Sequence, residues 1–593
     1  MRTKQTASEY KLLSGLFFRL LPYQVLLIVI SAVNGIVDSL FASNAIKEGV
    51  TAMSAIGLFG PINHFLYALS MMLVSGTQML YGRYLAKDRE KIHGLFSANL
   101  LSSLGVSLLT AGLLALGVVT GATRVLVQDP AVLTMLNGYI LGQAVGIPAL
   151  VVGQQLFAFL SLENQKTRTM AASLVCFVFN GIMDYVLLVP VPWGTFGLGL
   201  SSSLSMWVFL AVQAVFYLRG KSEWKPSPRR ARWRDVPQIA KLGYPGALSR
   251  FVEMFRCLIV NALILKAVGP DGLSAFAASN SVLAVFWALP FGMMAVSRML
   301  FSISVGEEDR RSLRDAMHVV LTRGMPIMCG VAALLALLAD PLTRLFYHDP
   351  AAPVYAMTVN GFRLLPLCMP LAVLSLNFAC FAQTAEKKVL SVVLPVVDGM
   401  LGVVLCSLFL IPAMQMDGLY LANILNGVIC LLVILAGSWL ARKRPPRSLE
   451  DLMAIPARIG VSPEERIDIS VRDMVQVTEV SGRVIAFCKE RGIDGRRAFW
   501  AGLCLEEMAG NVIAHGFTAD SAAHSVDIRV THKDQDIILR IRDNCLAFNP
   551  TEYARLMEPG EAGKNAGIRL VFRAARDVRY QNLLGMNVLT IRI

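Results

Sequence analysis

One carboxylate, Asp38, lies in the first long apolar stretch of this 593-residue chain. The stretch begins near Leu16 and is long enough to cross a bilayer, which places Asp38 about where the middle of the membrane would be. An ionisable side chain at that depth is costly and by default marks a pathway for ions or substrates. The alternative is an aspartate near the helix end whose carboxylate reaches water. We favour the pathway, and expect the surrounding helices to be arranged around this acid.

Two further apolar stretches carry polar side chains at helical spacing. Asn180 and Asp184 are four residues apart, so a helix would place both side chains on one face. The alternative is that they only join neighbouring helices by hydrogen bonds. Glu253 has Arg250 and Arg256 nearby at helical spacing, so a plain Glu–Arg ion pair competes with a functional role for this acid.

Another group of polar residues lies near the C-terminus, in the segment LEEMAGNVIAHGF. Glu507 and Asn511 are one helical turn apart on one face, and His515 continues that face. An amide oxygen is a suitable ligand for a hard cation, and a carboxylate beside it could act as a base. The alternative for Glu507 is a solvated helix carboxylate, as Glu506 beside it could be.

The tail also contains a glycine-rich loop that opens a helix, GEAGKNAGIRLV. Gly560, Gly563 and Gly567 could let backbone N–H groups and the helix N-terminus bind phosphates. A glycine-rich loop by itself is weak evidence for a nucleotide site, so its meaning depends on the segments around it.

The composition of the chain changes near residue 449. Hydrophobic residues make up 55% of the chain and charged residues only 16%, which is typical of a polytopic membrane protein. Residues 450–593 contain 19 Lys/Arg and 20 Asp/Glu, so the net charge of +14 belongs to the membrane part and reflects loop charge, not a nucleic-acid surface. The ten cysteines are scattered without a CxxC motif, which predicts neither a disulfide framework nor a zinc site.

Twelve apolar runs of spanning length precede the tail, and the loops between them alternate in charge. Lys and Arg cluster before the first run and after every even-numbered run, which predicts that both termini lie in the cytoplasm of a cell-membrane protein. The runs are 16–42, 53–80, 94–121, 134–160, 168–192, 195–218, 243–268, 275–305, 316–339, 357–383, 387–411 and 417–441.

The two halves of this membrane part repeat. The triplet at Met79 recurs at Met299, and the Asp-Pro pair at Asp129 recurs at Asp349, both at an offset of 220 residues. Six spans per half predict two parallel six-helix repeats with the substrate path between them. The tail alternates helix and strand signals, which predicts an α+β sandwich of helices on one mixed sheet. The expected domains are a first lobe at 1–220, a second lobe at 221–441, a linker at 442–465 and the tail domain at 466–593.

The membrane part resembles the multidrug and toxic compound extrusion (MATE) family over roughly residues 15–441. IVDSLFAS is similar to the family's Val-Asp-Thr-x-x-x-Gly pattern, FNGIMDYVLLVP to its Asn-x-x-x-Asp element, and GLGLSSSLS to its Gly-x-x-Gly-x-x-Ala-Thr-like segments. The resemblance implies a cation site in the amino lobe that binds a proton or Na⁺. Its residues would be Asp38, Asn180, Asp184 and Ser202. Glu253, eight residues after Pro245, is placed like a membrane glutamate of sodium-coupled relatives.

The tail resembles the GHKL, or Bergerat-like, ATPase fold, and most closely its anti-sigma-factor serine-kinase branch. The resemblance implies that Asn511 binds Mg²⁺ of bound ATP, that Glu507 activates the attacking hydroxyl, and that His515 belongs to the same box. Asp543 in IRDNCLAFNP matches the aspartate that accepts from the adenine amino group, and Gly563 and Gly567 would belong to the phosphate lid. Cys545 stands where the family usually has glycine, and the lid's Gly-x-Gly has become Asn-Ala-Gly. These three sequence boxes, LEEMAGNVIAHGF, IRDNCLAFNP and GEAGKNAGIRLV, occur in the family's order. Their presence favours nucleotide binding more strongly than catalysis.

Together these observations predict a polytopic α-helical membrane protein of twelve spans with a cytoplasmic ATP-binding α+β domain. The expected function is H⁺- or Na⁺-coupled export of small organic molecules, regulated by or signalling through the tail. The expected partners are such a substrate, membrane lipid and a STAS-type or sigma-factor-like protein, without nucleic acid. The alternatives are a membrane-anchored serine/threonine kinase or anti-sigma regulator with a transporter-like sensor, and a transporter with a chemically inert nucleotide-binding scaffold. No P-loop GxxxxGK[ST] occurs, so the tail is not expected to drive transport.

Overall fold

The computed structural model describes residues 2–87, 90–162, 166–219, 229, 231–306, 309–456, 459–461, 463–517, 526–533, 535–545, 548–551, 566–583 and 586–593. The chain divides into two compact units. The first consists of Met1–Met299 and Ala316–Ala454, and the second of Leu300–Asp315 and Ile455–Ile593. The boundary after Ala454 falls within the expected linker, and a short segment between two predicted spans belongs to the second unit.

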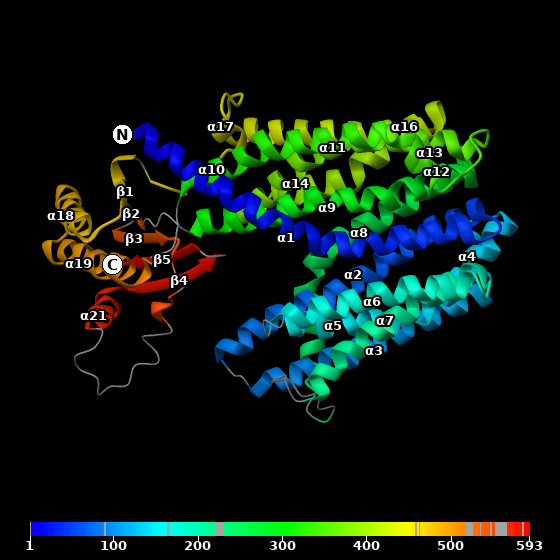
Figure 1. Cartoon of the computed structure of the whole chain (residues 1–593), viewed down its shortest axis with the longest axis horizontal. Helices are drawn as coiled ribbons and strands as arrows, with labels where there is room; N and C mark the ends of the chain where they lie inside the picture. The colour runs from blue at the N-terminus through cyan, green and yellow to red at the C-terminus, as the bar shows by residue number, and fades with distance from the viewer. Residues whose placement is uncertain are drawn as a thin grey trace. The chain divides into compact units, whose positions relative to one another are not determined.

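Apart from residues 300–315, the long apolar helices up to residue 454 form the first unit (Figure 1). They and their flanking turns are α1 (Arg2–Ala45), α2 (Gly49–Lys87), α3 (Glu90–Val119), η1 (Ala122–Val125), α4 (Pro130–Ala144), α5 (Ile147–Leu162), α6 (Lys166–Leu188), α7 (Gly194–Leu218), η3 (Trp233–Asp235), α8 (Val236–Ala267), α9 (Pro270–Gly306), α10 (Arg310–Val319), η4 (Val320–Gly324), α11 (Met325–Leu337), α12 (Ala339–Arg344), α13 (Pro353–Leu364), η5 (Leu365–Cys368), α14 (Met369–Thr384), α15 (Leu390–Val396), η6 (Val397–Leu401), α16 (Gly402–Arg442) and α17 (Leu449–Met453). Helices α1, α6 and α7 pack on one another, and α13 and α14 pack on α16.

Each predicted span overlaps helix, but the count of twelve is not confirmed. Among the described residues, eight helices are long and apolar enough to cross a membrane, or nine if the bent pair α4–α5 is one span. One of the eight, Leu390–Arg442, contains two helices joined at Gln415, whose backbone is not helical. Pro412 lies three residues before this break, as expected where a proline removes a backbone hydrogen bond.

The repeated Asp-Pro pair makes the same local hydrogen bond in both halves. Asp129 accepts a hydrogen bond from the backbone N–H of Ala131 at 2.8 Å, and Asp349 accepts one from Ala351 at 2.9 Å. In the first half this aspartate is the N-cap of α4, whose first residue is proline. In the second half the helix starts later, at Pro353 of α13, so the two halves share the hydrogen bond but not the helix start.

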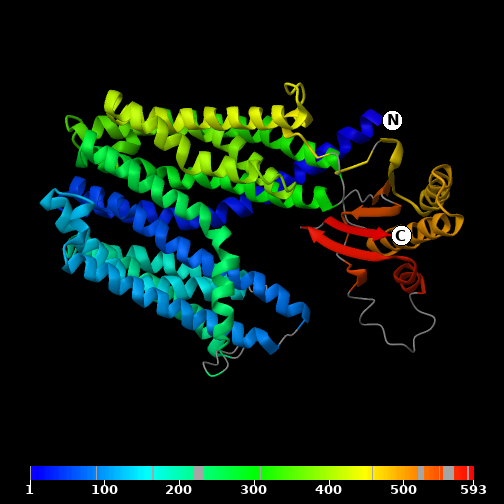
Figure 2. The same ribbon diagram turned by 180° about the vertical axis from the view of Figure 1, so that it is seen from behind.

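The second unit contains a five-stranded sheet with helices on one face (Figures 1 and 2). Its elements are β1 (Arg466–Val471), α18 (Met474–Glu490), α19 (Gly495–Asn511), η8 (Val512–Gly516), β2 (Val526–Lys533), β3 (Asp536–Asp543), α21 (Ala566–Ala574), β4 (Asp577–Leu583) and β5 (Met586–Arg592), with a short turn η7 (Pro463–Glu465) before β1. The strand order is β1-β2-β3-β5-β4 and every neighbouring pair is antiparallel. The prediction of a mixed sheet is wrong, since every pair is antiparallel, and β1 and β4 were not among the predicted strands.

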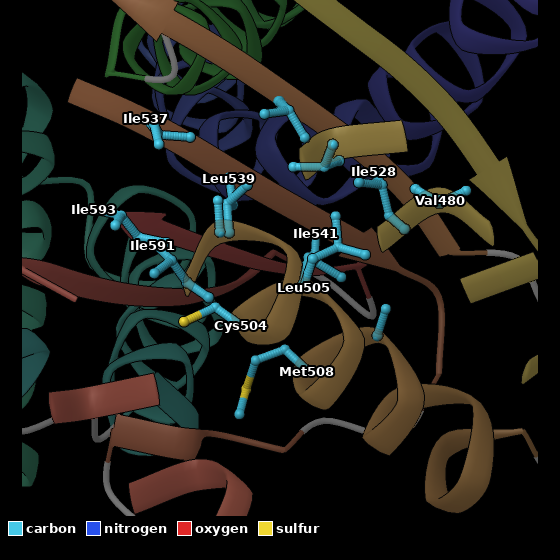
Figure 3. Packing of buried hydrophobic residues seen from close by; sticks show 14 of the residues in the cluster. Val480, Cys504, Leu505, Met508, Ile528, Ile537, Leu539, Ile541, Ile591 and Ile593 are labelled. Carbon is cyan, nitrogen blue, oxygen red and sulfur yellow. The ribbon is translucent and has the colours of Figure 1, made fainter. Parts of the chain in front are cut away.

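Alternation along the strands explains which face the helices cover. Ile528, Leu539 and Ile541 lie on one face and pack on Leu505 and Met508 of α19 (Figure 3). Each such fully buried side chain contributes about 1.5–3 kcal/mol through removal of apolar surface from water. The intervening residues point to the opposite face. Aspartate side chains cap the covering helices, Asp473 at α18 and Asp494 at α19.

Candidate functional site

The predicted cation-site residues of the first lobe form one hydrogen-bonded network. The side-chain amide of Asn180 donates to Asp184 Oδ2 at 2.9 Å and to Asp38 Oδ1 at 3.1 Å, so one amide joins two carboxylates. Ser202 donates to the other oxygen of Asp38 at 3.3 Å. These side chains come from α1, α6 and α7, and the structure brings together all four residues that the sequence singled out.

Two members of this network were not predicted. Ser201 donates to Asp184 Oδ1, and Asn34 donates to Asn180 Oδ1 at 3.1 Å. Asn34 precedes Asp38 by one helical turn, so the spacing rule that paired Asn180 with Asp184 could have found it. The buried Oδ1 of Asn34 has no hydrogen-bond partner among the described residues.

Burial makes the charge on this network costly. Asn180 and Asp184 are 1% and 0% exposed. Two ionised carboxylates joined through one neutral amide repel each other more strongly in an apolar setting than in water. One added positive charge would reduce that repulsion.

Glu253 belongs to a different group of residues. It accepts from Arg250 of the same helix, α8, at 2.7 Å, and His64 Nδ1 of α2 lies 3.3 Å from the same Oε2 atom. Among the described contacts, none joins Glu253 to the four residues around Asp38. The Glu–Arg pair considered from the sequence is present, and His64 is an addition that spacing within one helix could not reveal.

The second lobe contains its own carboxylate network, which the sequence analysis missed and in which a half-buried aspartate meets two buried partners. Asp398 accepts from Ser375 of α14 at 2.7 Å and from the Asn426 amide of α16 at 2.9 Å. It lies in the π-helical turn η6. Such turns inside helices are frequent at functional sites, and this one could have been suspected from an aspartate in an apolar run.

In the second unit, the candidate nucleotide residues come from the end of α19, from η8 and from the end of β3. Glu507 and Asn511 lie one turn apart on α19, and His515 is exposed in η8. Gly567 lies directly against Glu507 at the start of α21, because a Cβ atom at position 567 would overlap the Glu507 carboxylate. The fold thus places the segment LEEMAGNVIAHGF beside the helix that the glycine-rich loop opens.

Asp543 ends β3 on the face covered by the helices. Its Oδ1 accepts from Asn587 of β5 at 2.6 Å and from the backbone N–H of Cys545 at 3.0 Å. Cys545 is buried, and a Cβ on Gly516 would lie 2.9 Å from the Cys545 Cβ. The thiol side chain therefore packs against η8 where the family usually has glycine. Asn587, the directly opposite residue in the sheet, was not predicted.

The donor set fits a nucleotide-bound Mg²⁺ better than a protein-only metal site. Among the described residues, no group of three or more His, Cys, Asp or Glu could hold a metal ion. Mg²⁺ commonly takes only one or two protein ligands together with phosphates, and the Asn511 side chain has no hydrogen-bond partner in the described part of the chain. Gly560 and Gly563 lie outside the described residues.

Burial changes the acidity of a thiol beside this group. Burial, and then the nearby carboxylate of Glu507, raise the pKa of Cys504 to about 12. A thiol with so high a pKa stays protonated at neutral pH and is a poor nucleophile. Cys504 is fully buried in the hydrophobic core of the second unit.

Comparison with known proteins decides the family of the first unit. The sequence matches the MatE family over residues 25–186 and 245–408, which together are more than half of the chain. The chain belongs to the MatE family. It is thus an integral, multi-pass membrane protein, and the two matched segments correspond to the repeat seen in the sequence. Residues 453–593 match the histidine kinase-like ATPase domain family, as the tail motifs indicated.

Relatives and solved structures agree with this MatE assignment. A "Probable multidrug resistance protein NorM" of Aromatoleum aromaticum is 25% identical over 37% of this chain and 49% of its own length. Another of that name, from Neisseria meningitidis serogroup A, is 24% identical over 60% of this chain and 77% of its length. The chain therefore spans about half of the first relative and about three quarters of the second.

Solved MATE transporters have the same fold as the first unit. A structure described as the inward-facing conformation of a multidrug resistance MATE family transporter superposes with a TM-score of 0.65 at 17% identity, covering 75% of this chain and all of that one. An outward-facing MATE structure superposes with a TM-score of 0.56 at 18% identity, covering 72% and 95%. The MATE-like helical fold is thereby confirmed.

Proposed function

We propose that this MatE-family protein is a cation-coupled exporter of small organic molecules whose ATP-binding domain regulates transport. The observation that carries the proposal is the network in which Asn180 joins Asp38 and Asp184. Ionisable groups inside a membrane-spanning bundle are rare and mark ion or substrate pathways.

The coupling ion would be H⁺ or Na⁺ at this network. A shared proton or a bound Na⁺ would supply the positive charge that two neighbouring carboxylates favour, one buried (Asp184) and one half-buried (Asp38). The unpartnered Oδ1 of Asn34 gives one more oxygen to such an ion. Because the three helices α1, α6 and α7 each contribute to the network, ion binding and release would change how they pack, which is the requirement for coupling.

The substrate class follows from the family and from its relatives. The relatives are named as multidrug resistance proteins, which points to small organic molecules as the exported compounds. Glu253, with His64 and Arg250, and Asp398, with its own partners, remain candidates for a second ion or substrate contact.

The tail would bind ATP and Mg²⁺ on the cytoplasmic side. Asn511 would be a Mg²⁺ ligand, Asp543 would contact adenine, His515 and Gly567 would line the phosphates, and Glu507 would act as base if phosphoryl transfer occurs. A specific observation keeps the kinase alternative open: Glu507 of α19 lies against Gly567 at the start of α21, where a base would be needed. In that alternative the tail would phosphorylate a STAS-type or sigma-factor-like partner.

Reconstituted vesicles test the proposal directly. The purified full-length protein would be placed in proteoliposomes with a pH or Na⁺ gradient, with or without Mg-ATP on the side of the tail. We expect gradient-driven accumulation of a cationic dye and a change in its rate with ATP. Transport with neither gradient would refute cation coupling, whereas no transport together with a tail that phosphorylates a protein partner would favour the signalling alternative.

A further inference from the structure

The helix-free face of the sheet in the second unit has an unusual charge arrangement. Arg529 of β2 and Arg540 of β3 are directly opposite each other in the antiparallel register. Both alternate with core residues, so both point away from the helices, yet they are only 3% and 4% exposed. Like charges directly opposite on adjacent strands repel each other, and burial increases the cost.

One carboxylate lies between these two arginines. Asp309, which is 1% exposed, contacts a guanidinium nitrogen of Arg529 and lies 3.2 Å from Nη1 of Arg540 through the same Oδ2 atom. Arg529 also contacts Asp468, its register partner on β1. Negative and positive groups therefore alternate from β1 to β3, and Asp309 balances the pair that would otherwise repel.

The Asp309 carboxylate is also oriented by its own segment. The backbone N–H of Ser312 donates to Asp309 Oδ1 at 3.1 Å, and the Ser312 hydroxyl donates to Oδ2. Burial alone would raise the pKa of Asp309, but Arg529 and Arg540 lower it well below its ordinary value. The carboxylate is therefore ionised at neutral pH, as this ion-pair network requires.

The position of Asp309 in the chain relates this contact to the helices long enough to cross a membrane. It lies between α9, which contains a stretch apolar and long enough to cross a membrane, and α10, which begins another. On the sheet side, Arg540 is three residues from Asp543 on β3, about 10 Å along the strand, and the two side chains lie on opposite faces. One strand thus carries both the contact to the segment and the expected adenine contact.

We propose that Asp309 is the docking point through which nucleotide binding at the tail acts on residues 309–315, that is, Asp309 and the first turns of α10. This inference rests on the proposed function, since it names the route of regulation. The group that occupies the helix-free face of the sheet at the two arginines is this segment of the same chain. Its carboxylate is opposite to the arginines in charge and close enough to contact both. By linkage, a state that binds ATP more tightly would bind the segment with a different affinity as well.

Hydrogen exchange on the full-length protein in detergent, with and without Mg-ATP, tests this. Asp309→Asn keeps the shape but leaves two buried arginines without their shared carboxylate. We expect exchange in residues 309–315 and in β2–β3 to become faster by on the order of 10²-fold, the usual scale for breaking a buried pair. ATP should change the exchange of residues 309–315 in the wild type and leave it unchanged in the variant.

Asp315→Asn is the matched control, because Asp315 lies on the same segment and pairs with Arg314 there. It should exchange like the wild type. If Asp309→Asn unfolds the second unit, Arg540→Lys keeps the charge and should give an intermediate exchange rate with the ATP response retained.

Three outcomes separate this inference from the proposed function. Wild-type exchange in residues 309–315 that does not respond to ATP would overturn the inference, even if ATP alters transport. If ATP changes the exchange of residues 309–315 but does not change transport, the docking route is supported and regulation of export is refuted. Equal exchange in wild type and Asp309→Asn would show that the ion pair does not secure the segment, and the inference would fail.

Discussion

Replacing Asp38 by asparagine isolates the charge of the first-lobe network from its shape. In the wild type, Asp38 accepts from Asn180 through Oδ1 and from Ser202 through Oδ2. An asparagine can keep its carbonyl oxygen toward Asn180 and donate from its amide to the Ser202 hydroxyl, which can also accept. Both hydrogen bonds therefore survive, and only the ionisable group is lost.

The magnitudes expected for this variant follow from that exchange. A hydrogen bond to a charged group contributes about 1.5–3 kcal/mol and a neutral one about 0.5–1.5 kcal/mol. The loss is offset by removal of the repulsion between Asp38 and Asp184, so stability should change by no more than about 2 kcal/mol. Coupling should change far more. A tenfold ion gradient corresponds to about 1.4 kcal/mol per ion, and so to at most about tenfold accumulation for one ion per substrate.

The assay is gradient-driven uptake of a fluorescent cation into proteoliposomes, with the accumulation ratio as readout. We expect the ratio for Asp38→Asn to fall to about one while the protein still inserts and melts cooperatively. Asp340→Asn serves as a control, because this carboxylate pairs with Tyr355 and Arg344 outside the network. If Asp38→Asn accumulates substrate as the wild type does, the assignment of the coupling site is refuted.

Four further results are expected. Arg447 has an exposed side chain in the linker, so Arg447→Cys should react with a membrane-impermeant maleimide only in inverted vesicles. Labelling of intact cells would overturn the predicted orientation. Ser448 is a less suitable position because its hydroxyl accepts from the Asp451 N–H. By calorimetry on the full-length protein, Asn511→Ala should abolish the Mg²⁺-dependent part of ATP binding, whereas Asp543→Asn should weaken binding with or without Mg²⁺; equal effects of the metal on both variants would contradict the assigned roles. Glu507→Gln should leave ATP binding nearly intact and lower any phosphoryl transfer by roughly 10²–10⁴, so a large loss of binding would show that it positions ATP instead. Gly567→Ala should displace the flexible Glu507 side chain at a cost in stability of less than about 1 kcal/mol. It should lower phosphoryl transfer as Glu507→Gln does. Phosphoryl transfer at the wild-type rate would show that Glu507 is not the base.

Local periodicity and charge were sufficient to predict the membrane class, recurring motifs predicted the repeat, and the resemblance of three segments to the GHKL fold predicted the ATPase-like tail. Hydropathy identifies helices that must satisfy their own backbone hydrogen bonds in lipid, and each predicted range does contain helix. Spacing of four residues correctly grouped Asn180 with Asp184, because a helix fixes which side chains share a face. Where the local signal was weak the prediction was wrong: β1 and β4 were missed, and with them the antiparallel pattern of the sheet.

Only the tertiary structure decided which separate elements meet. Asn34 and Ser201 join the network because α1, α6 and α7 pack together, and His64 reaches Glu253 from another helix. The contact of Asp309 with Arg529 and Arg540 spans more than 200 residues of sequence, and its charge balance depends on strand register. Sequence periodicity reports the environment along one element, whereas pairing between distant elements depends on how the whole chain excludes water and compensates buried charge.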